Sequence, residues 1–220
     1  MKKYILTISI GINLVFAVLM IRHLAVSHRI NKIKKITYWL HRDEVLNHLQ
    51  IDSNSIVFAG DSHTQQFELA ELFGSLNVKN RGINFDTSTG LLKRVSELTK
   101  GARKVFIEIG SNDVTQKIPK GTTVSNINRI VEKIRTESPK TIIYVESIIP
   151  MKNHQMLIDT LNKAIRNLCD AHKLSFINLD PLFLKDGLNP KYDSGDGVHL
   201  NSKGYFAWKG ILTPYIFIRE

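Results

Sequence analysis

The 220-residue chain has a single cysteine, so no disulfide bond can form within it. Cys169 lies in a helical pattern with no Cys–His signature around it, and we expect a small buried side chain rather than a nucleophile. Low-complexity tracts and repeats of fixed period are absent, which excludes fibrous and repeat architectures. The chain also lacks zinc-finger spacing and any basic stretch interleaved with aromatic residues, so no nucleic-acid partner is expected.

Negative charge is scarce near the N-terminus. The formal net charge is +10, and residues 1–50 hold eight Lys and Arg against two Asp and Glu. Residues 51–220 hold twenty-two against eighteen, a net charge of only +4. Basic residues beside an apolar segment are typical of contact with anionic lipid head groups. Membrane lipid is therefore an expected partner of the N-terminal segment.

That apolar segment is an uncharged run of eighteen residues, 4–21. As a helix it would be about 27 Å long, close to the ~30 Å thickness of the hydrocarbon core. We predict that residues 1–22 are a transmembrane anchor or a cleaved secretory signal. The anchor is favoured because Arg22 and His23 follow the run directly, where a cleavage site needs small residues. We expect the rest of the chain to face away from the cytoplasm.

Residues 23–50 form the next predicted segment. Ile30, Ile33, Ile36, Trp39 and Leu40 recur at steps of three and four, which predicts an amphipathic helix over residues 29–49. This stem either packs on the main domain or lies on a membrane surface, and the pattern does not distinguish the two.

Residues 51–220 alternate between strand and helix patterns, which predicts an α/β domain with a mostly parallel sheet and helices on both faces. Five strands are expected, at residues 56–59, around Val78, and at 105–109, 141–149 and 174–179. Helical patterns cover residues 67–73, 88–100, 123–138, 154–172 and 203–217. Ligands of such sheets bind beyond the carboxyl ends of the strands. Polar motifs follow three of these strands: Gly60-Asp61-Ser62, Arg81-Gly82 and Gly110-Ser111-Asn112-Asp113.

Ser62 is a candidate nucleophile, although a serine before a helix is also a common helix cap. Asp196-Gly197-Val198-His199 favours catalysis, because a carboxylate three residues before a histidine can accept its Nδ1–H and leave Nε2 facing Ser62. His63 is a competing base, ranked lower because adjacent side chains on a turn usually point apart. Acyl transfer also needs hydrogen-bond donors for the developing oxyanion, and the Ser62 N–H, the Gly82 N–H and the Asn112 amide are candidates.

These four motifs, in this order and at strand ends, resemble the signature blocks of SGNH/GDSL-type hydrolases, which include lipases, acylhydrolases and esterases. The resemblance spans residues 55–215. It implies a flavodoxin-like three-layer α/β/α fold, with Ser62 as nucleophile, His199 as base and Asp196 as its partner. It assigns Ser62, Gly82 and Asn112 to the oxyanion hole and implies no metal or organic cofactor.

Two residues depart from related patterns. His63 stands where the family often has Leu or Ile. Thr64 replaces the last glycine of the Gly-x-Ser-x-Gly elbow, which argues against the larger α/β-hydrolase class.

The expected activity is hydrolysis of a short acyl ester, an O-acetyl group on carbohydrate. Three alternatives stay open: a lysophospholipase or thioesterase acting on lipid, an O-acetyltransferase using the same triad, and a binding module that has kept the fold without the activity.

Overall fold

The computed structural model describes residues 2–179, 182–184 and 187–217. It divides into two compact units, Met1–His41 and Arg42–Glu220. Helix α1 (Lys2–Asn47) runs without interruption through the first unit and ends inside the second. No break in the helix marks the expected boundary between residues 22 and 23, so the division into anchor and stem stays a prediction.

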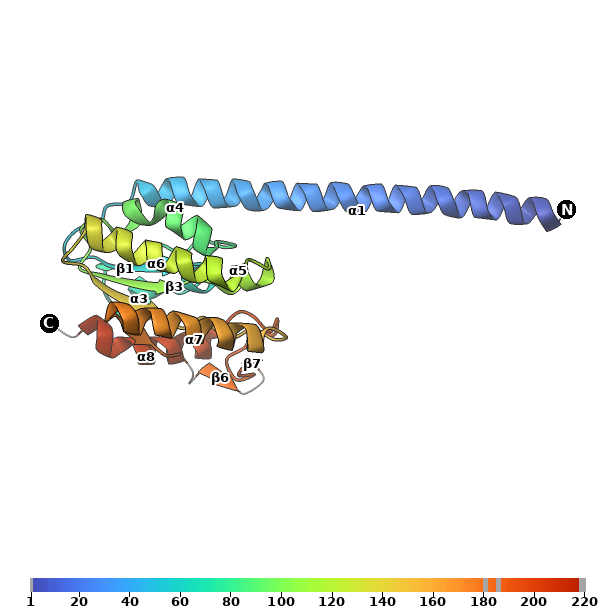
Figure 1. Ribbon diagram of the computed structural model, residues 1–220. Helices are drawn as coiled ribbons and strands as arrows, with labels where there is room; N and C mark the ends of the chain where they lie inside the picture. The colour runs from blue at the N-terminus through green and yellow to red at the C-terminus, as the bar shows by residue number, and fades with distance from the viewer. Residues whose placement is uncertain (1, 180–181, 185–186, 218–220) are drawn as a thin grey trace. The chain divides into compact units, whose positions relative to one another are not determined.

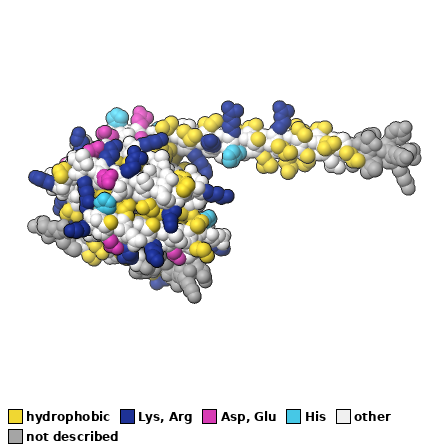
Figure 2. Space-filling model, in the orientation of Figure 1, with side chains coloured by type: hydrophobic (Ala, Val, Ile, Leu, Met, Phe, Trp, Pro, Cys, Tyr) yellow, Lys and Arg dark blue, Asp and Glu magenta, His cyan; other side chains and the backbone are white. Residues whose placement is uncertain are grey.

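Within the described part of the chain, the portion of α1 from Ile10 to Asn47 is the one helix long and apolar enough to cross a membrane. Its most apolar 18-residue window has a mean hydropathy of 1.9. Large apolar side chains there are well exposed, with Phe16 at 66% and Ile21 at 64%. Figure 2 shows hydrophobic side chains gathered along this part of α1, with Lys and Arg side chains farther along the helix. Such an exposed apolar surface suits a lipid environment better than water.

The second unit is built on a five-stranded parallel sheet with the strand order β2-β1-β3-β4-β5. The strands are β1 (Ile56–Gly60), β2 (Val78–Asn80), β3 (Lys104–Glu108), β4 (Ile142–Glu146) and β5 (Ser175–Ile177). Every residue of β1 and β3 is buried, because both strands are covered on both faces. The expected parallel sheet of five strands is therefore confirmed, although β4 ends three residues earlier than the apolar pattern suggested.

Seven helices and a short hairpin complete the described part of this unit. The helices are α2 (Ser62–Gln65), α3 (Leu69–Phe73), α4 (Ser88–Thr99), α5 (Ser111–Thr115), α6 (Lys120–Glu137), α7 (Gln155–His172) and α8 (Ser202–Phe217). The antiparallel pair β6 (Phe183–Leu184) and β7 (Gly187–Leu188) was not expected from the sequence. Helix α6 begins three residues before the predicted start, directly after Pro119, whose fixed φ suits a helix entrance.

The helices cover the sheet on both faces, which confirms the three-layer α/β/α arrangement. Figure 1 shows α4 and α6 on one side of β1 and β3, and α8 on the other. One face carries an aromatic core in which Phe58 stacks on Phe106 at 4.5 Å between ring centroids, and Trp208 of α8 stacks on Phe67 at 4.7 Å. Burying rings of this size stabilises the fold by roughly 1.5–3 kcal/mol each. Cys169 lies buried on α7 as expected, and burial raises the pKa of its thiol to about 12, so the thiol stays protonated.

Candidate active site

The Ser62 turn lies where β1 ends and α2 begins. Gly60 is required there, because a Cβ atom on it would come within 2.2 Å of the Thr64 hydroxyl and 2.3 Å of the Glu108 carbonyl. Asp61 is fully buried and caps α2 by accepting the His63 N–H at 3.0 Å. This tight turn leaves Ser62 half-buried at the edge of the sheet.

The structure brings Ser62, His199 and Asp196 together as the sequence motifs predict. The Ser62 Oγ lies 3.1 Å from His199 Nε2, and His199 Nδ1 lies 2.7 Å from Asp196 Oδ2. Because an ionised carboxylate only accepts hydrogen bonds, His199 carries its proton on Nδ1 when neutral, and Nε2 is free to accept the Ser62 proton. The arrangement is therefore competent to deprotonate the serine hydroxyl.

The loop that carries His199 is held by two aspartates. Asp196 Oδ1 accepts the backbone N–H groups of Val198 and His199, at 2.9 and 2.8 Å. Asp193 Oδ1 accepts those of Gly195 and Gly197 in the same way. The Asp196 side chain is 51% exposed. Its slight burial alone would raise the pKa, but the His199 ring and the two backbone donors lower the pKa well below the usual value. Asp196 therefore stays ionised at acidic pH.

The three predicted oxyanion donors differ in how available they are. The Ser62 N–H has no hydrogen-bond partner among the described residues. The Asn112 amide makes only a long contact of 3.5 Å with Asp61, so it can turn toward a ligand. The Gly82 N–H donates to the Asn80 side chain at 2.9 Å, a bond that an oxyanion would have to replace.

Gly82 has a different structural reason to be glycine. A Cβ atom there would lie 2.3 Å from the Gln65 backbone nitrogen, so the residue allows the chain after β2 to pass close to α2. From sequence alone, a glycine that lets a helix approach and one that lets a substrate approach look the same.

Sequence reasoning missed the buried polar residues that support these motifs. Arg94 of α4 pairs with Asp86 at 2.7 Å and donates to the carbonyls of Gly60 and Arg81, and it thereby connects α4 to the ends of β1 and β2.

A second set of buried hydrogen bonds lies around α5. The Ser111 hydroxyl donates to Asp61 at 2.5 Å. Asp113 accepts the Ser88 and Thr123 hydroxyls, and Asn126 of α6 donates to Ser88. Only the placement of polar residues in otherwise apolar helical patterns could have indicated this network.

Two buried glutamates end the central strands. Burial and the nearby Asp61 charge raise the pKa of Glu108, the last residue of β3, well above its usual value. Burial raises the pKa of Glu146, the last residue of β4, to about 8, although the Trp208 indole donates to it at 2.6 Å. Glu146 is therefore mostly protonated at pH 7, and Glu108 is protonated more readily than an exposed glutamate.

The described residues contain one group that could hold a metal ion. Ligand atoms of Asp61, His63 and Glu108, all buried, lie within 4.8 Å of one another. The His63 Nδ1 and Asp61 Oδ1 atoms are 3.4 Å apart, a spacing that a protonated imidazole beside a carboxylate also explains. His63 is not placed to act as the base, because its ring is buried and its Nε2 contacts the Val198 carbonyl at 2.9 Å.

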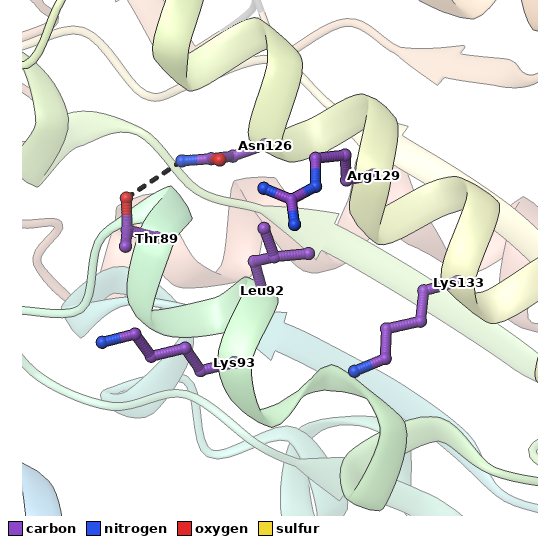
Figure 3. A pocket seen from close by; sticks show the side chains of 6 residues that line it. All are labelled: Thr89, Leu92, Lys93, Asn126, Arg129 and Lys133. Atoms are coloured by element: carbon purple, nitrogen blue, oxygen red, sulfur yellow. Dashed lines mark hydrogen bonds between the residues drawn. The ribbon is translucent and has the colours of Figure 1, made fainter.

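A separate hollow of about 420 Å³ lies between α4 and α6. Figure 3 shows its lining, in which Asn126 donates to the Thr89 hydroxyl and the cationic side chains of Lys93, Arg129 and Lys133 surround Leu92. None of the triad residues lines this hollow, so it is not the place where Ser62 would meet an ester.

Comparison with known proteins gives a family and a set of related folds. The model of the GDSL-like lipase/acylhydrolase family matches residues 55–207. No curated protein matches the chain. A structure from Streptococcus pneumonia, named for platelet activating factor, is 25% identical, covers 88% of this chain and 99% of its own, and has a TM-score of 0.81.

Two further solved structures share the fold. A GDSL-like lipase from Bacteroides thetaiotaomicron is 24% identical over 81% of this chain and 96% of its own, with a TM-score of 0.71. The acetyl xylan esterase AlAXEase is 19% identical over 74% of this chain and 100% of its own, with a TM-score of 0.63. These likenesses span nearly the whole length of the related chains.

Proposed function

The chain belongs to the GDSL-like lipase/acylhydrolase family, a family of ester hydrolases, and from this premise we propose that it is a serine esterase that removes short acyl groups, O-acetyl in particular, from carbohydrate. Ser62 is the nucleophile, His199 the general base and Asp196 the residue that orients His199. The observation that carries this proposal is the continuous chain of hydrogen bonds from Ser62 Oγ through His199 to Asp196, at 3.1 and 2.7 Å.

The reaction follows from these contacts in two steps. The Ser62 oxygen attacks the ester carbonyl while His199 Nε2 takes the hydroxyl proton, and the imidazolium is stabilised by Asp196. His199 then gives this proton to the departing alcohol, which leaves an acyl group on Ser62. Water attacks that acyl group with His199 again accepting a proton, and the carboxylic acid is released as Ser62 regains its hydrogen.

The oxyanion that forms in each step needs donors, and we assign this role to the Ser62 N–H, the Asn112 amide and, once it is released from Asn80, the Gly82 N–H. Asn112→Ala is expected to lower kcat by about 10²–10³, because the donor acts mainly on the transition state. Steady-state kinetics should show little change in KM. Thr115→Ala is the matched control. It removes a hydroxyl that donates to the backbone carbonyl of Asn112, and so it shows whether a disturbance of α5 alone lowers the rate. A loss below tenfold would remove Asn112 from this role.

A short acyl group on carbohydrate is favoured by the open position of the triad. The side chains of His199 and Asp196 are 29% and 51% exposed, so an acyl group attached to a bulky polar chain can reach Ser62. An acetyl xylan esterase also shares this fold. The lipid alternative is supported by the apolar part of α1, which would hold the domain near a membrane.

Hydrolysis of p-nitrophenyl esters of increasing acyl length by the full-length chain in detergent separates these two substrates. We expect kcat/KM to be highest for the acetyl ester and to fall by at least tenfold by the octanoyl ester. A rise with chain length would instead support a lysophospholipase or thioesterase. Product analysis with an added sugar acceptor tests the transferase alternative, since acetylated sugar would appear in place of free acetate. Absence of activity on every ester, with the chain folded, would contradict the esterase proposal.

We further propose that α1 anchors the domain in a membrane, with the basic residues after the apolar run contacting anionic head groups. The domain would face away from the cytoplasm, an orientation that Lys2 and Lys3 before the run favour and the basic residues after the run oppose. Retention in the membrane pellet after carbonate extraction is expected. A reporter fused to the C-terminus that is active only in the cytoplasm would reverse the orientation.

A further inference from the structure

His63 contacts both segments that build the triad. It follows Ser62 directly, and its side chain is fully buried. The His63 Nε2 lies 2.9 Å from the carbonyl of Val198, the residue before His199, and the two histidine rings are 5.5 Å apart between centroids. His63 therefore links the nucleophile turn to the loop that carries the base, segments separated by more than 130 positions in the sequence.

The hydrogen-bond partners determine the protonation of His63. A backbone carbonyl can only accept, so the Nε2 atom facing Val198 carries a hydrogen. The Nδ1 atom lies 3.4 Å from Asp61 Oδ1. Asp61 accepts from the Ser111 hydroxyl and from the His63 N–H, which is the pattern of an ionised carboxylate. Within the described part of the chain Nδ1 makes no bond of hydrogen-bond geometry, so the ring is held by its Nε2 bond to Val198.

The electrostatics of the surroundings agree with this assignment. Burial alone would lower the pKa of His63, but the nearby Asp61 carboxylate, with a contribution from Glu108, raises the pKa to about 9, so the ring keeps its Nε2 hydrogen near neutral pH. The other titratable groups facing His63 are His199 and Tyr205 of α8, whose hydroxyl donates to the His63 carbonyl at 3.2 Å.

We propose that His63 is a positioning residue for the hydrolysis: its Nε2–H binds the Val198 carbonyl and keeps His199 Nε2 within hydrogen-bond distance of Ser62. This inference rests on the proposed function. Without the His63 donor, the Val198 carbonyl has no bond across to the Ser62 turn, and His199 can move away from Ser62. A misplacement of about 1 Å lowers the rate of such a step by about 10²-fold.

Two variants test the bridge. His63→Leu removes the donor and is expected to lower kcat by about 10²-fold with KM changed less than threefold. His63→Gln can still donate to Val198, and it should recover at least tenfold of that loss. A Leu variant with wild-type kcat, or a Gln variant no more active than the Leu variant, would overturn the proposal.

Nuclear magnetic resonance of the full chain labelled with 15N-histidine tests the donor without using activity. We expect the His63 Nε2 to carry a hydrogen at pH 7.5, and a ring whose Nε2 carries none would overturn the proposal even if the Leu variant does not fold. If the wild type shows no Ser62-dependent hydrolysis, the esterase proposal fails, and the resonance result alone decides the state of His63.

Discussion

Ser62→Ala is expected to lower kcat for p-nitrophenyl acetate by about 10⁴–10⁶. Alanine has no oxygen to attack the carbonyl, so the acyl-enzyme step is lost. What remains is the binding of the ester and the oxyanion donors, which accelerate attack by water only weakly. Steady-state kinetics of the wild type and the variant, prepared in parallel, measure the difference.

The same variant should fold normally. The Ser62 side chain is half-buried, and the geometry of its turn comes from Gly60 and the buried Asp61, which the substitution leaves in place. The free energy of unfolding should therefore change by less than about 0.5 kcal/mol. Ser96→Ala is a matched control, because that hydroxyl bonds Glu137 on the surface between α4 and α6. It is expected to keep wild-type activity.

Covalent labelling distinguishes a lost nucleophile from a contaminating esterase. An alkyl p-nitrophenyl phosphonate should add one phosphonyl group to the wild-type chain and none to Ser62→Ala, as intact mass spectrometry would show. Retention of more than a tenth of the activity by the variant, or labelling of another serine, would remove Ser62 from the nucleophile role.

The parts of the site that the sequence predicted well are those determined by short-range patterns. A buried apolar run that stops at Gly60 predicts both the strand and the position of Ser62, because parallel strands bring their carboxyl ends to one edge. The spacing of Asp196 and His199 predicts their contact for a similar reason, since a tight turn of three residues leaves few other arrangements.

The parts that could not be predicted depend on contacts between distant segments. As the residue next to Ser62, His63 is expected to point away from the site. Its partner is instead the Val198 carbonyl, 135 positions further along the chain. The Arg94–Asp86 pair looks like two ordinary surface charges until α4 is packed on the sheet. Glycine at position 82 predicts a close approach to the backbone, and only the structure shows that α2 is one of the groups that approach it.

Asp196→Asn is the second substitution with a large expected effect, a loss of about 10³–10⁴ in kcat. An amide can donate to His199 Nδ1, which would place the ring proton on Nε2, facing Ser62. That tautomer cannot accept the hydroxyl proton, so the base is lost although every atom stays nearly in place. The amide oxygen can still accept the backbone N–H groups of Val198 and His199, as Asp196 Oδ1 does, so the loop should keep its conformation.

Asp193→Asn is the matched control for this loop. Asp193 also accepts two backbone N–H groups, those of Gly195 and Gly197, but it makes no contact with the His199 ring. Its asparagine variant should stay within about threefold of the wild type, because each lost charge-assisted bond leaves a neutral one in its place. Equal losses in the two variants would mean that the loop needs negative charge in general rather than a carboxylate at His199. A large loss in Asp196→Asn alone, with KM unchanged, would assign the effect to the orientation and tautomer of the catalytic base.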